Sequence, residues 1–152
     1  MAPITIDIPS LNRQQISLRV PHAGTMCLLD SATAWDEEQI VARAVSHRAL
    51  DNPLRQDHRL SALCAVEYAG QAMALHGSLV SGTRNPAPGF LASLREVEFT
   101  RRHLDDLPSP LVIKVRKLAG DGSMLLYCFE VASGEEIIAT GRMAVAFSGT
   151  TA

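Results

Sequence analysis

Two residues, Glu67 and His47, have side chains and surroundings that suit proton-transfer chemistry. Glu67 lies in an apolar stretch of small residues, 63–77, which predicts a helix packed on nearly all sides. A carboxylate in such a place is costly unless it is paired or protonated. His47 follows an alternating run, residues 39–46, which predicts a strand. An acid on a buried helix and a histidine at a strand end can act together as an acid–base pair.

The elements that position this pair follow from hydrophobic spacing and turn residues. Ser61 is the expected N-cap of a helix that runs to about residue 79, and a polar loop at residues 50–60 precedes it. The other patterns predict strands at residues 26–34, 39–46, 90–100, 111–119, 124–132 and 136–147. Turn signals separate the last three strands at Asp121-Gly122 and Ser133-Gly134.

The order of these elements predicts the fold class. A single long apolar helix can be covered by an antiparallel sheet only if that sheet curls around it, which predicts an α+β fold with a curved sheet and one buried central helix. A length of 152 residues fits a single domain, residues 1–152, in which residues 1–20 form an irregular N-terminal arm.

Composition and charge exclude several other classes of protein. A net charge of −2 gives no general attraction to nucleic acid. The N-terminus has no signal-peptide pattern, and no apolar run approaches the roughly 18 residues of a membrane span. The three cysteines form no CxxC pair, which argues against a zinc site or a disulfide framework. We therefore expect a cytoplasmic protein without metal, nucleic-acid partner or membrane span.

Three segments resemble the hotdog-fold 3-hydroxyacyl-[acyl-carrier-protein] dehydratases of fatty-acid synthesis, in the same order. Residues 21–30 (PHAGTMCLLD) are similar to that family's P-H-x-x-P-x-L-L-x-D. His47 with Asn52-Pro53 resembles H-F-P-G-x-P, and residues 63–72 (LCAVEYAGQA) resemble V-L-x-x-E-x-x-A-Q. Arg48-Ala49 and a longer loop between His47 and Glu67 depart from this pattern. These departures resemble a divergent branch, the dehydratases of aryl polyene and pigment pathways.

The resemblance implies an enzyme that removes water from 3-hydroxyacyl thioesters on acyl carrier protein, giving trans-2-enoyl thioesters in fatty-acid-like or polyene synthesis. It implies His47 as the base and Glu67 as the acid or water-orienting group. It implies no cofactor, because the substrate arrives on the phosphopantetheine of the carrier protein or on CoA. In this family the histidine and glutamate of one site come from different subunits. The resemblance therefore implies a homodimer or higher oligomer, or a heteromer with a related hotdog chain.

Residues beside the pair are predicted to contact the substrate. The start of the helix offers the backbone N–H of Ala62 or Leu63 to the thioester oxygen. Gln71 shares the helix face of Glu67, four residues away, and can hold its carboxylate by a hydrogen bond. The loop before the helix completes the predicted substrate-binding set with Pro53 and Leu54.

A local basic cluster follows the helix in the sequence and consists of Arg95, Arg101 and Arg102. Acyl carrier proteins are acidic, so this cluster is a candidate docking site for one. The alternative is an ordinary solvated rim of charges.

Other functions and roles stay open. A hotdog thioesterase would use Glu67 or Asp51 to activate water and would not need His47. A non-catalytic acyl-binding partner of another hotdog subunit would need neither Glu67 nor His47. In structural terms, Glu67 could be a buried acid satisfied by Arg43 or by backbone. Two further histidines have other expected roles: His58 as a rival base, and His76 as a group near the negative end of the helix dipole.

Overall fold

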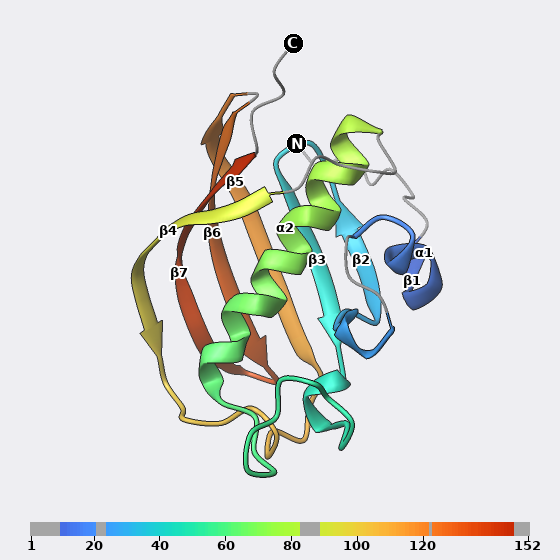
Figure 1. Cartoon of the computed structure of the whole chain (residues 1–152), viewed down its shortest axis with the longest axis vertical. Coiled ribbons are helices and arrows are strands. Elements are labelled where there is room, and N and C mark those ends of the chain that lie inside the picture. The colour runs from blue at the N-terminus through green and yellow to red at the C-terminus, as the bar shows by residue number, and fades with distance from the viewer. Residues whose placement is uncertain (1–9, 21–23, 83–88, 122, 148–152) are drawn as a thin grey trace.

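A long helix lies across the concave side of one curved antiparallel sheet (Figure 1). The computed structural model describes residues 10–20, 24–82, 89–121 and 123–147. Within these residues the helix is α2, Ala65–Ser81, and the sheet has seven strands in the order β1-β2-β3-β5-β6-β7-β4. The predicted α+β architecture is confirmed.

The strands have the following bounds: β1 Leu11–Asn12, β2 Ser31–Trp35, β3 Gln39–Ala44, β4 Gly89–Phe99, β5 Leu111–Gly120, β6 Met124–Ser133 and β7 Glu136–Phe147. Short helical segments connect them: α1 Arg13–Ser17 and the 3₁₀ turns η1 Gly24–Met26, η2 Ser46–Arg48 and η3 Ala62–Cys64. Strand β4 forms one edge of the sheet and β1 forms the other, on opposite sides of Figure 1.

Helix α2 begins and ends at residues suited to those positions. The side chain of Ser61 accepts a hydrogen bond of 3.2 Å from the N–H of Leu63, which starts the 3₁₀ turn η3 and then α2. Gly82 ends the helix with a left-handed backbone (φ +71). Small residues, among them Ala65, Ala69 and Ala72, are fully buried along it. The predicted helix is confirmed, with its first turn wound more tightly.

Alternation in the strands decides which side chains face the helix. In β3, Ile40, Ala42 and Ala44 are fully buried, and the strand contacts α2. Arg43 is exposed and therefore lies on the opposite face of the sheet from Glu67. The suggested pairing of Arg43 with Glu67 is wrong because the pleat turns the arginine away from the helix.

The predicted strand at residues 26–34 is confirmed only in its second half, where β2 begins at Ser31. Before that point the backbone pairs with a side chain from the helix: Leu28 N–H and Met26 C=O both bond to Gln71. The turn at Ser133-Gly134 is confirmed, because Ser133 pairs with Glu136 across a two-residue loop. Gly122, of the other predicted turn, lies outside the described residues.

Candidate active site

Two loops meet beneath the start of α2, at the bottom of Figure 1. His47 is buried on the η2 turn that precedes one of them. One loop follows η2 and the other joins β4 to β5. They are held together by backbone hydrogen bonds, from Leu104 N–H to Leu60 C=O (2.9 Å) and from Ala62 N–H to Arg102 C=O (2.8 Å). This arrangement brings the second loop, with Leu107, against the η2 turn that carries His47.

The ring of His47 is fully buried and has one nitrogen in use. Its Nε2 lies 3.0 Å from the carbonyl oxygen of Leu107. Because a carbonyl only accepts hydrogen bonds, Nε2 carries the proton and Nδ1 of the neutral ring carries the lone pair. Among the described residues Nδ1 has no hydrogen-bond partner. Leaving a buried acceptor unpaired is costly, so such an atom calls for an explanation. A general base needs a free lone pair, and Nδ1 of His47 has one.

Burial lowers the pKa of His47 below its ordinary value of 6.5, and this outweighs the hydrogen bond to Leu107, which favours the protonated ring. The ring is therefore neutral at neutral pH. A shallow, open pocket lies beside it, and its lining residues are Val45, His47, Arg48, Ala49, Pro108 and Pro110.

Glu67 lies in the first turn of α2 and is half-buried. Neither ring nitrogen of His47 is hydrogen-bonded to Glu67 of the same chain. Their sequence neighbours do meet: Tyr68 Oη lies 2.7 Å from Ser46 Oγ. The two candidates are thus carried by adjoining segments, and no hydrogen bond joins the His47 ring to Glu67 within one chain.

The two amides predicted to bind the thioester oxygen already have partners. Ala62 is buried and its N–H donates to the backbone of the β4–β5 loop. Ala62 is therefore not free to receive a substrate oxygen, and that prediction is corrected. The N–H of Leu63 bonds to the hydroxyl of Ser61, which a stronger acceptor can displace. Leu63 thus remains the better candidate.

Gln71 has a different role from the predicted one. Its side chain is fully buried; Oε1 accepts from Leu28 N–H at 2.9 Å, and Nε2 donates to Met26 C=O at 2.6 Å. The amide is committed to the segment before β2, so it fastens that segment to α2. Neither of these bonds is to the Glu67 carboxylate, and contact of Gln71 with substrate stays a prediction.

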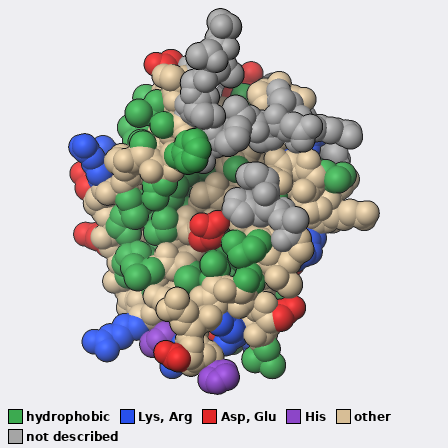
Figure 2. Space-filling model, in the orientation of Figure 1, with side chains coloured by type: hydrophobic (Ala, Val, Ile, Leu, Met, Phe, Trp, Pro, Cys, Tyr) green, Lys and Arg blue, Asp and Glu red, His purple; other side chains and the backbone are tan. Residues whose placement is uncertain are grey.

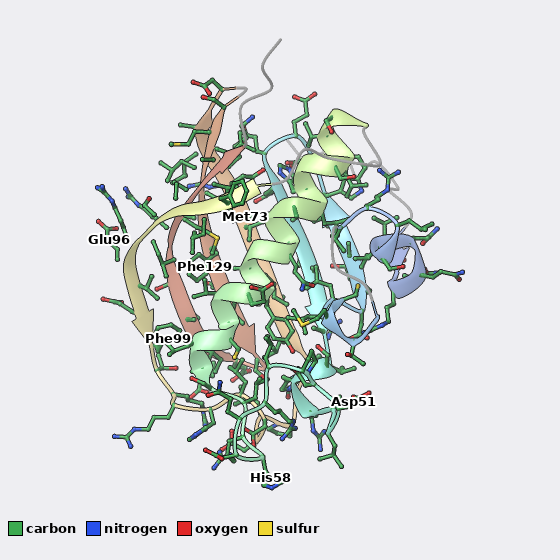
Figure 3. All side chains as sticks on the ribbon, viewed as in Figure 1. Asp51, His58, Met73, Glu96, Phe99 and Phe129 are labelled. Atoms are coloured by element: carbon green, nitrogen blue, oxygen red, sulfur yellow. The ribbon has the colours of Figure 1, made fainter. Side chains whose placement is uncertain are left out.

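The loop after η2 carries the remaining candidates. Leu54 is half-buried and packs on the core, whereas Pro53 is exposed; their contact with substrate stays a prediction. Asp51 and His58 are both exposed, and Figure 3 places His58 at the far tip of the loop. Neither lines the pocket beside His47, which disfavours His58 as the base and Asp51 as the group that activates water there.

The three arginines of the predicted docking cluster are all exposed but lie in two places. Arg95 is within the edge strand β4, with its Cα paired to Arg142. Arg102 lies beside the start of α2, and Arg101 forms an ion pair with Glu136. Docking of a carrier protein stays a prediction, with Arg102 the member nearest to the helix start.

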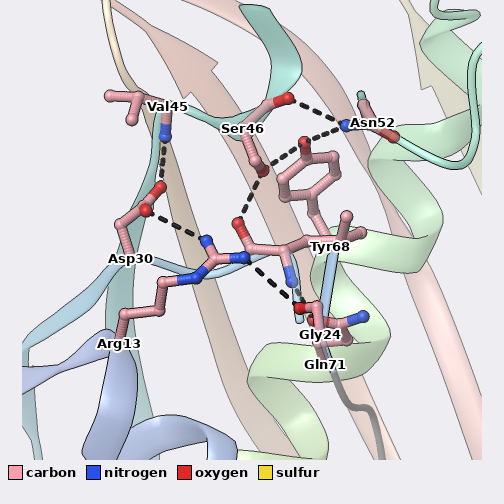
Figure 4. Close-up of polar contacts among 9 residues, drawn as sticks. Arg13, Gly24, Asp30, Val45, Ser46, Asn52, Tyr68 and Gln71 are labelled. Atoms are coloured by element: carbon pink, nitrogen blue, oxygen red, sulfur yellow. Dashed lines mark hydrogen bonds and ion pairs between the residues drawn. The ribbon is translucent and has the colours of Figure 1, made fainter. Parts of the chain in front are cut away.

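Sequence reasoning missed a polar cluster behind the η2 turn (Figure 4). Asn52 Nδ2 donates to Ser46 C=O (2.9 Å) and to Tyr68 Oη (3.3 Å). Asp30 accepts from Val45 N–H at 2.6 Å and pairs with Arg13. The sequence holds only weak signals of this cluster: a tyrosine within an alanine-rich helix, and two turn-forming residues near a histidine.

In the described ranges no helix has the length and hydropathy to cross a membrane. Over the same ranges, no group of three or more histidine, cysteine, aspartate or glutamate side chains is placed to hold a metal ion.

Comparison with solved structures identifies the fold as the hotdog fold. A chain of the dehydratase heterocomplex ApeI:P from Xenorhabdus doucetiae is similar with a TM-score of 0.78 and 20% identity, over 90% of this chain and 92% of that one. Thioesterase HI1161 from Haemophilus influenzae is similar with a TM-score of 0.63 and 12% identity, over 93% and 94%. Thioesterase superfamily member 2 from Mus musculus has a TM-score of 0.56 and 11% identity, over 77% and 80%.

These likenesses define the class as hotdog proteins, a class that includes both dehydratases and thioesterases. No curated protein sequence matches the chain. The family model described as ApeP dehydratase matches residues 14–150, so the chain belongs to the ApeP-like dehydratase family. The resemblance to a divergent hotdog branch of the aryl polyene type is confirmed.

Proposed function

We propose that this protein dehydrates 3-hydroxyacyl thioesters carried on acyl carrier protein to trans-2-enoyl thioesters, in fatty-acid-like or polyene synthesis. Membership of a dehydratase family supports the reaction class. The observation that carries the proposal is the state of His47: a buried neutral ring whose tautomer is set by Leu107, and whose Nδ1 has no partner among the described residues. His47 is also one of the residues that line the pocket.

The proposed reaction uses this nitrogen as the base. Nδ1 of His47 takes the proton from C2 of the substrate, and the electrons of that C–H bond form the C2=C3 double bond. The C3–O bond breaks, and a glutamic acid, Glu67 in its protonated form, gives its proton to the departing hydroxide so that water leaves. His47 then releases its extra proton to solvent, and Glu67 takes up a proton from solvent. Leu63 N–H is the proposed donor to the thioester oxygen.

We further propose that the glutamic acid comes from a second hotdog chain, because neither nitrogen of His47 bonds to Glu67 of its own chain. The edge strand β4 supports such an assembly. It ends the sheet and exposes Phe90, Leu91 and Leu94. The similar ApeP-containing structure is itself a heterocomplex of two chains, so the partner is either a copy of this chain or a related hotdog chain.

Mass spectrometry of a 3-hydroxyacyl carrier protein incubated with the enzyme tests the reaction. Loss of water from the acyl group is expected, and His47→Ala should slow it by about 10²–10⁴-fold because the base is removed. His58→Ala is the matched control, since that histidine is exposed at a loop tip and should leave the rate unchanged. Water loss that survives His47→Ala would contradict the base, and loss of the whole acyl group would indicate a thioesterase.

A further inference from the structure

A directed chain of hydrogen bonds joins α2 to the turn that carries His47 (Figure 4). Ser46 Oγ lies 2.6 Å from the carbonyl oxygen of Leu28 and 2.7 Å from Tyr68 Oη. Asn52 Nδ2 lies 3.3 Å from the same Tyr68 oxygen. Tyr68 is fully buried and Asn52 nearly so, which makes each of these bonds hard to replace with water.

The direction of every bond in this chain is determined. The Leu28 carbonyl can only accept, so the single hydroxyl proton of Ser46 is donated to it. Tyr68 must therefore donate its own proton to Ser46 Oγ. The two protons of Asn52 Nδ2 go to Tyr68 Oη and to Ser46 C=O. Burial raises the pKa of Tyr68 to about 12, so its hydroxyl remains a donor at every working pH.

Hydrogen bonds hold the backbone on both sides of His47, and this chain supplies those at Ser46. Ser46 directly precedes His47, and its carbonyl and hydroxyl are both held. One residue earlier, Val45 N–H is held by Asp30. On the far side, the guanidinium of Arg55 lies 3.4 Å from the His47 carbonyl oxygen. Tyr68, for its part, directly follows Glu67 in α2. One tyrosine hydroxyl thus links the segment of the base to the segment of the acid.

We propose that Tyr68 is a positioning residue for dehydration, acting through Ser46 and Asn52 to hold the ring of His47 in its catalytic orientation. This inference rests on the proposed function for its catalytic meaning. It differs from a general contribution to folding, because a misplacement of about 1 Å at a reacting group can cost roughly 10²-fold in rate. The loss should therefore fall on kcat, since the Tyr68 hydroxyl is fully buried and already bonded to Ser46 and Asn52.

The variant Tyr68→Phe tests this, and Tyr127→Phe is its matched control. Tyr127 is equally buried, and its hydroxyl bonds to His76 at 2.7 Å, on the C-terminal half of the same helix. Both variants remove one buried tyrosine hydroxyl. Tyr68→Phe should lower kcat by about 10–100-fold with KM changed less than about threefold, whereas Tyr127→Phe should leave kcat within about twofold. Equal losses of kcat in both variants would overturn the proposal.

A second readout does not depend on activity. Nitrogen NMR of the histidine rings, with His47 assigned by its absence in His47→Ala, reports its tautomer and its titration. In Tyr68→Phe the His47 signals should shift or broaden, whereas Tyr127→Phe should alter those of His76. Unchanged His47 signals in Tyr68→Phe would overturn the proposal. If the signals change but the wild-type protein releases no water from the substrate, the proposed function fails while the positioning by Tyr68 is supported.

Ser46→Ala is the second variant if Tyr68→Phe does not fold. It removes the hydroxyl that Tyr68 donates to and leaves the helix unchanged. It should reproduce the loss of kcat and the change in the His47 signals, and an unchanged kcat would overturn the proposal.

Discussion

His47 and His76 are two buried rings that differ in one atom. In both, Nε2 donates to a backbone carbonyl: Leu107 for His47 and Asp36 for His76. The Nδ1 of His76 accepts the hydroxyl proton of Tyr127, whereas the Nδ1 of His47 has no partner among the described residues. His76 is thus a satisfied structural group, whereas the sequence suggested only a histidine near the negative end of the helix dipole. His47 alone of these two keeps a lone pair for chemistry.

Both rings make stability depend on pH in the same direction. Burial lowers the pKa of His47 and of His76 below 6.5, so the unfolded chain binds protons that the folded chain refuses. Their contribution to stability is present above about pH 6.5 and is lost as the pH falls, by at most about 1.4 kcal/mol per pH unit for each ring. Urea unfolding between about pH 7.5 and pH 5.5 should show this loss.

The variant His76→Gln should reduce that pH dependence, because one of the two rings is removed. The lowered pKa values of Asp105 and Asp121 belong to a more acidic window, below the ordinary aspartate value of 3.8, and do not interfere. An identical slope in the wild type and in His76→Gln would contradict the assignment.

At this scale the sequence points to candidate residues but not to their contacts. Glu67 and His47 are candidates because a charged or titratable group in an apolar or strand-end setting is unusual. The side-chain hydrogen bonds of Tyr68, Ser46 and Gln71 were not predicted, because they join residues 16 to 45 positions apart through the tertiary fold. Local spacing predicted that Gln71 bonds to Glu67 on the same helix face. In the fold its side chain bonds instead to the segment before β2.

At the scale of elements, β6 and β7 meet at a close contact between Phe129 and Gly141, which are paired across the two strands. A Cβ on Gly141 would lie 2.8 Å from the Phe129 ring and 3.0 Å from a methyl of Val97 in β4. Phe129 is buried and lies between the sheet and α2 (Figure 3). The missing side chain at residue 141 therefore makes room for the aromatic ring.

Gly141→Ala should lower the free energy of unfolding by about 1–3 kcal/mol, because the ring or the strand must shift. Gly77→Ala in α2 is the control: its Cβ would meet nothing within 4 Å in this chain, and a better helix former should leave stability equal or up to about 1 kcal/mol higher. Urea unfolding measures both variants. Adding Phe129→Leu should recover part of the loss from Gly141→Ala, and strict additivity of the two changes would argue against the clash.

Alternation and turn residues predicted the long helix and most of the sheet, since residues on one face of an element need no distant partner to reveal them. Residues 26–30 were assigned to a strand for the same reason and are not in one. Their apolar side chains are buried as predicted, but their backbone partner is a glutamine from α2. Hydrophobic spacing reports burial and does not report where backbone hydrogen bonds go.

At the scale of the whole molecule, an apolar surface lies over β4 and the neighbouring part of α2. Figure 2 shows hydrophobic side chains gathered there around an acidic patch. The exposed hydrophobic residues of these elements include Leu63 at the helix start and Phe90, Leu91 and Leu94 in β4. An edge strand with such a surface is a ready template for pairing with another chain, which is the assembly proposed above.

Leu94→Lys should disrupt that assembly, because it would place a charge in the paired surface. A cost of at least about 2 kcal/mol corresponds to roughly 30-fold weaker association. Leu118→Lys is the matched control: the two leucines are 40% and 39% exposed, and Leu118 lies in β5, away from the edge. Light scattering of the protein, alone and co-expressed with a second hotdog chain, gives the mass. A wild-type monomer in both preparations, or an unchanged mass in Leu94→Lys, would contradict the pairing.

Side-chain hydrogen bonds fasten α2 at three heights along its axis, through Tyr68 to Ser46, Gln71 to Leu28, and His76 to Tyr127. Sliding a helix by one residue moves it by about 1.5 Å, which is enough to break bonds of 2.7–2.9 Å at all three heights together. The helix therefore has almost no freedom to translate within the sheet. Room for acyl chains of different length would have to come from the size of the side chains beside the helix or from the second chain, and related proteins should differ there rather than in the placement of α2.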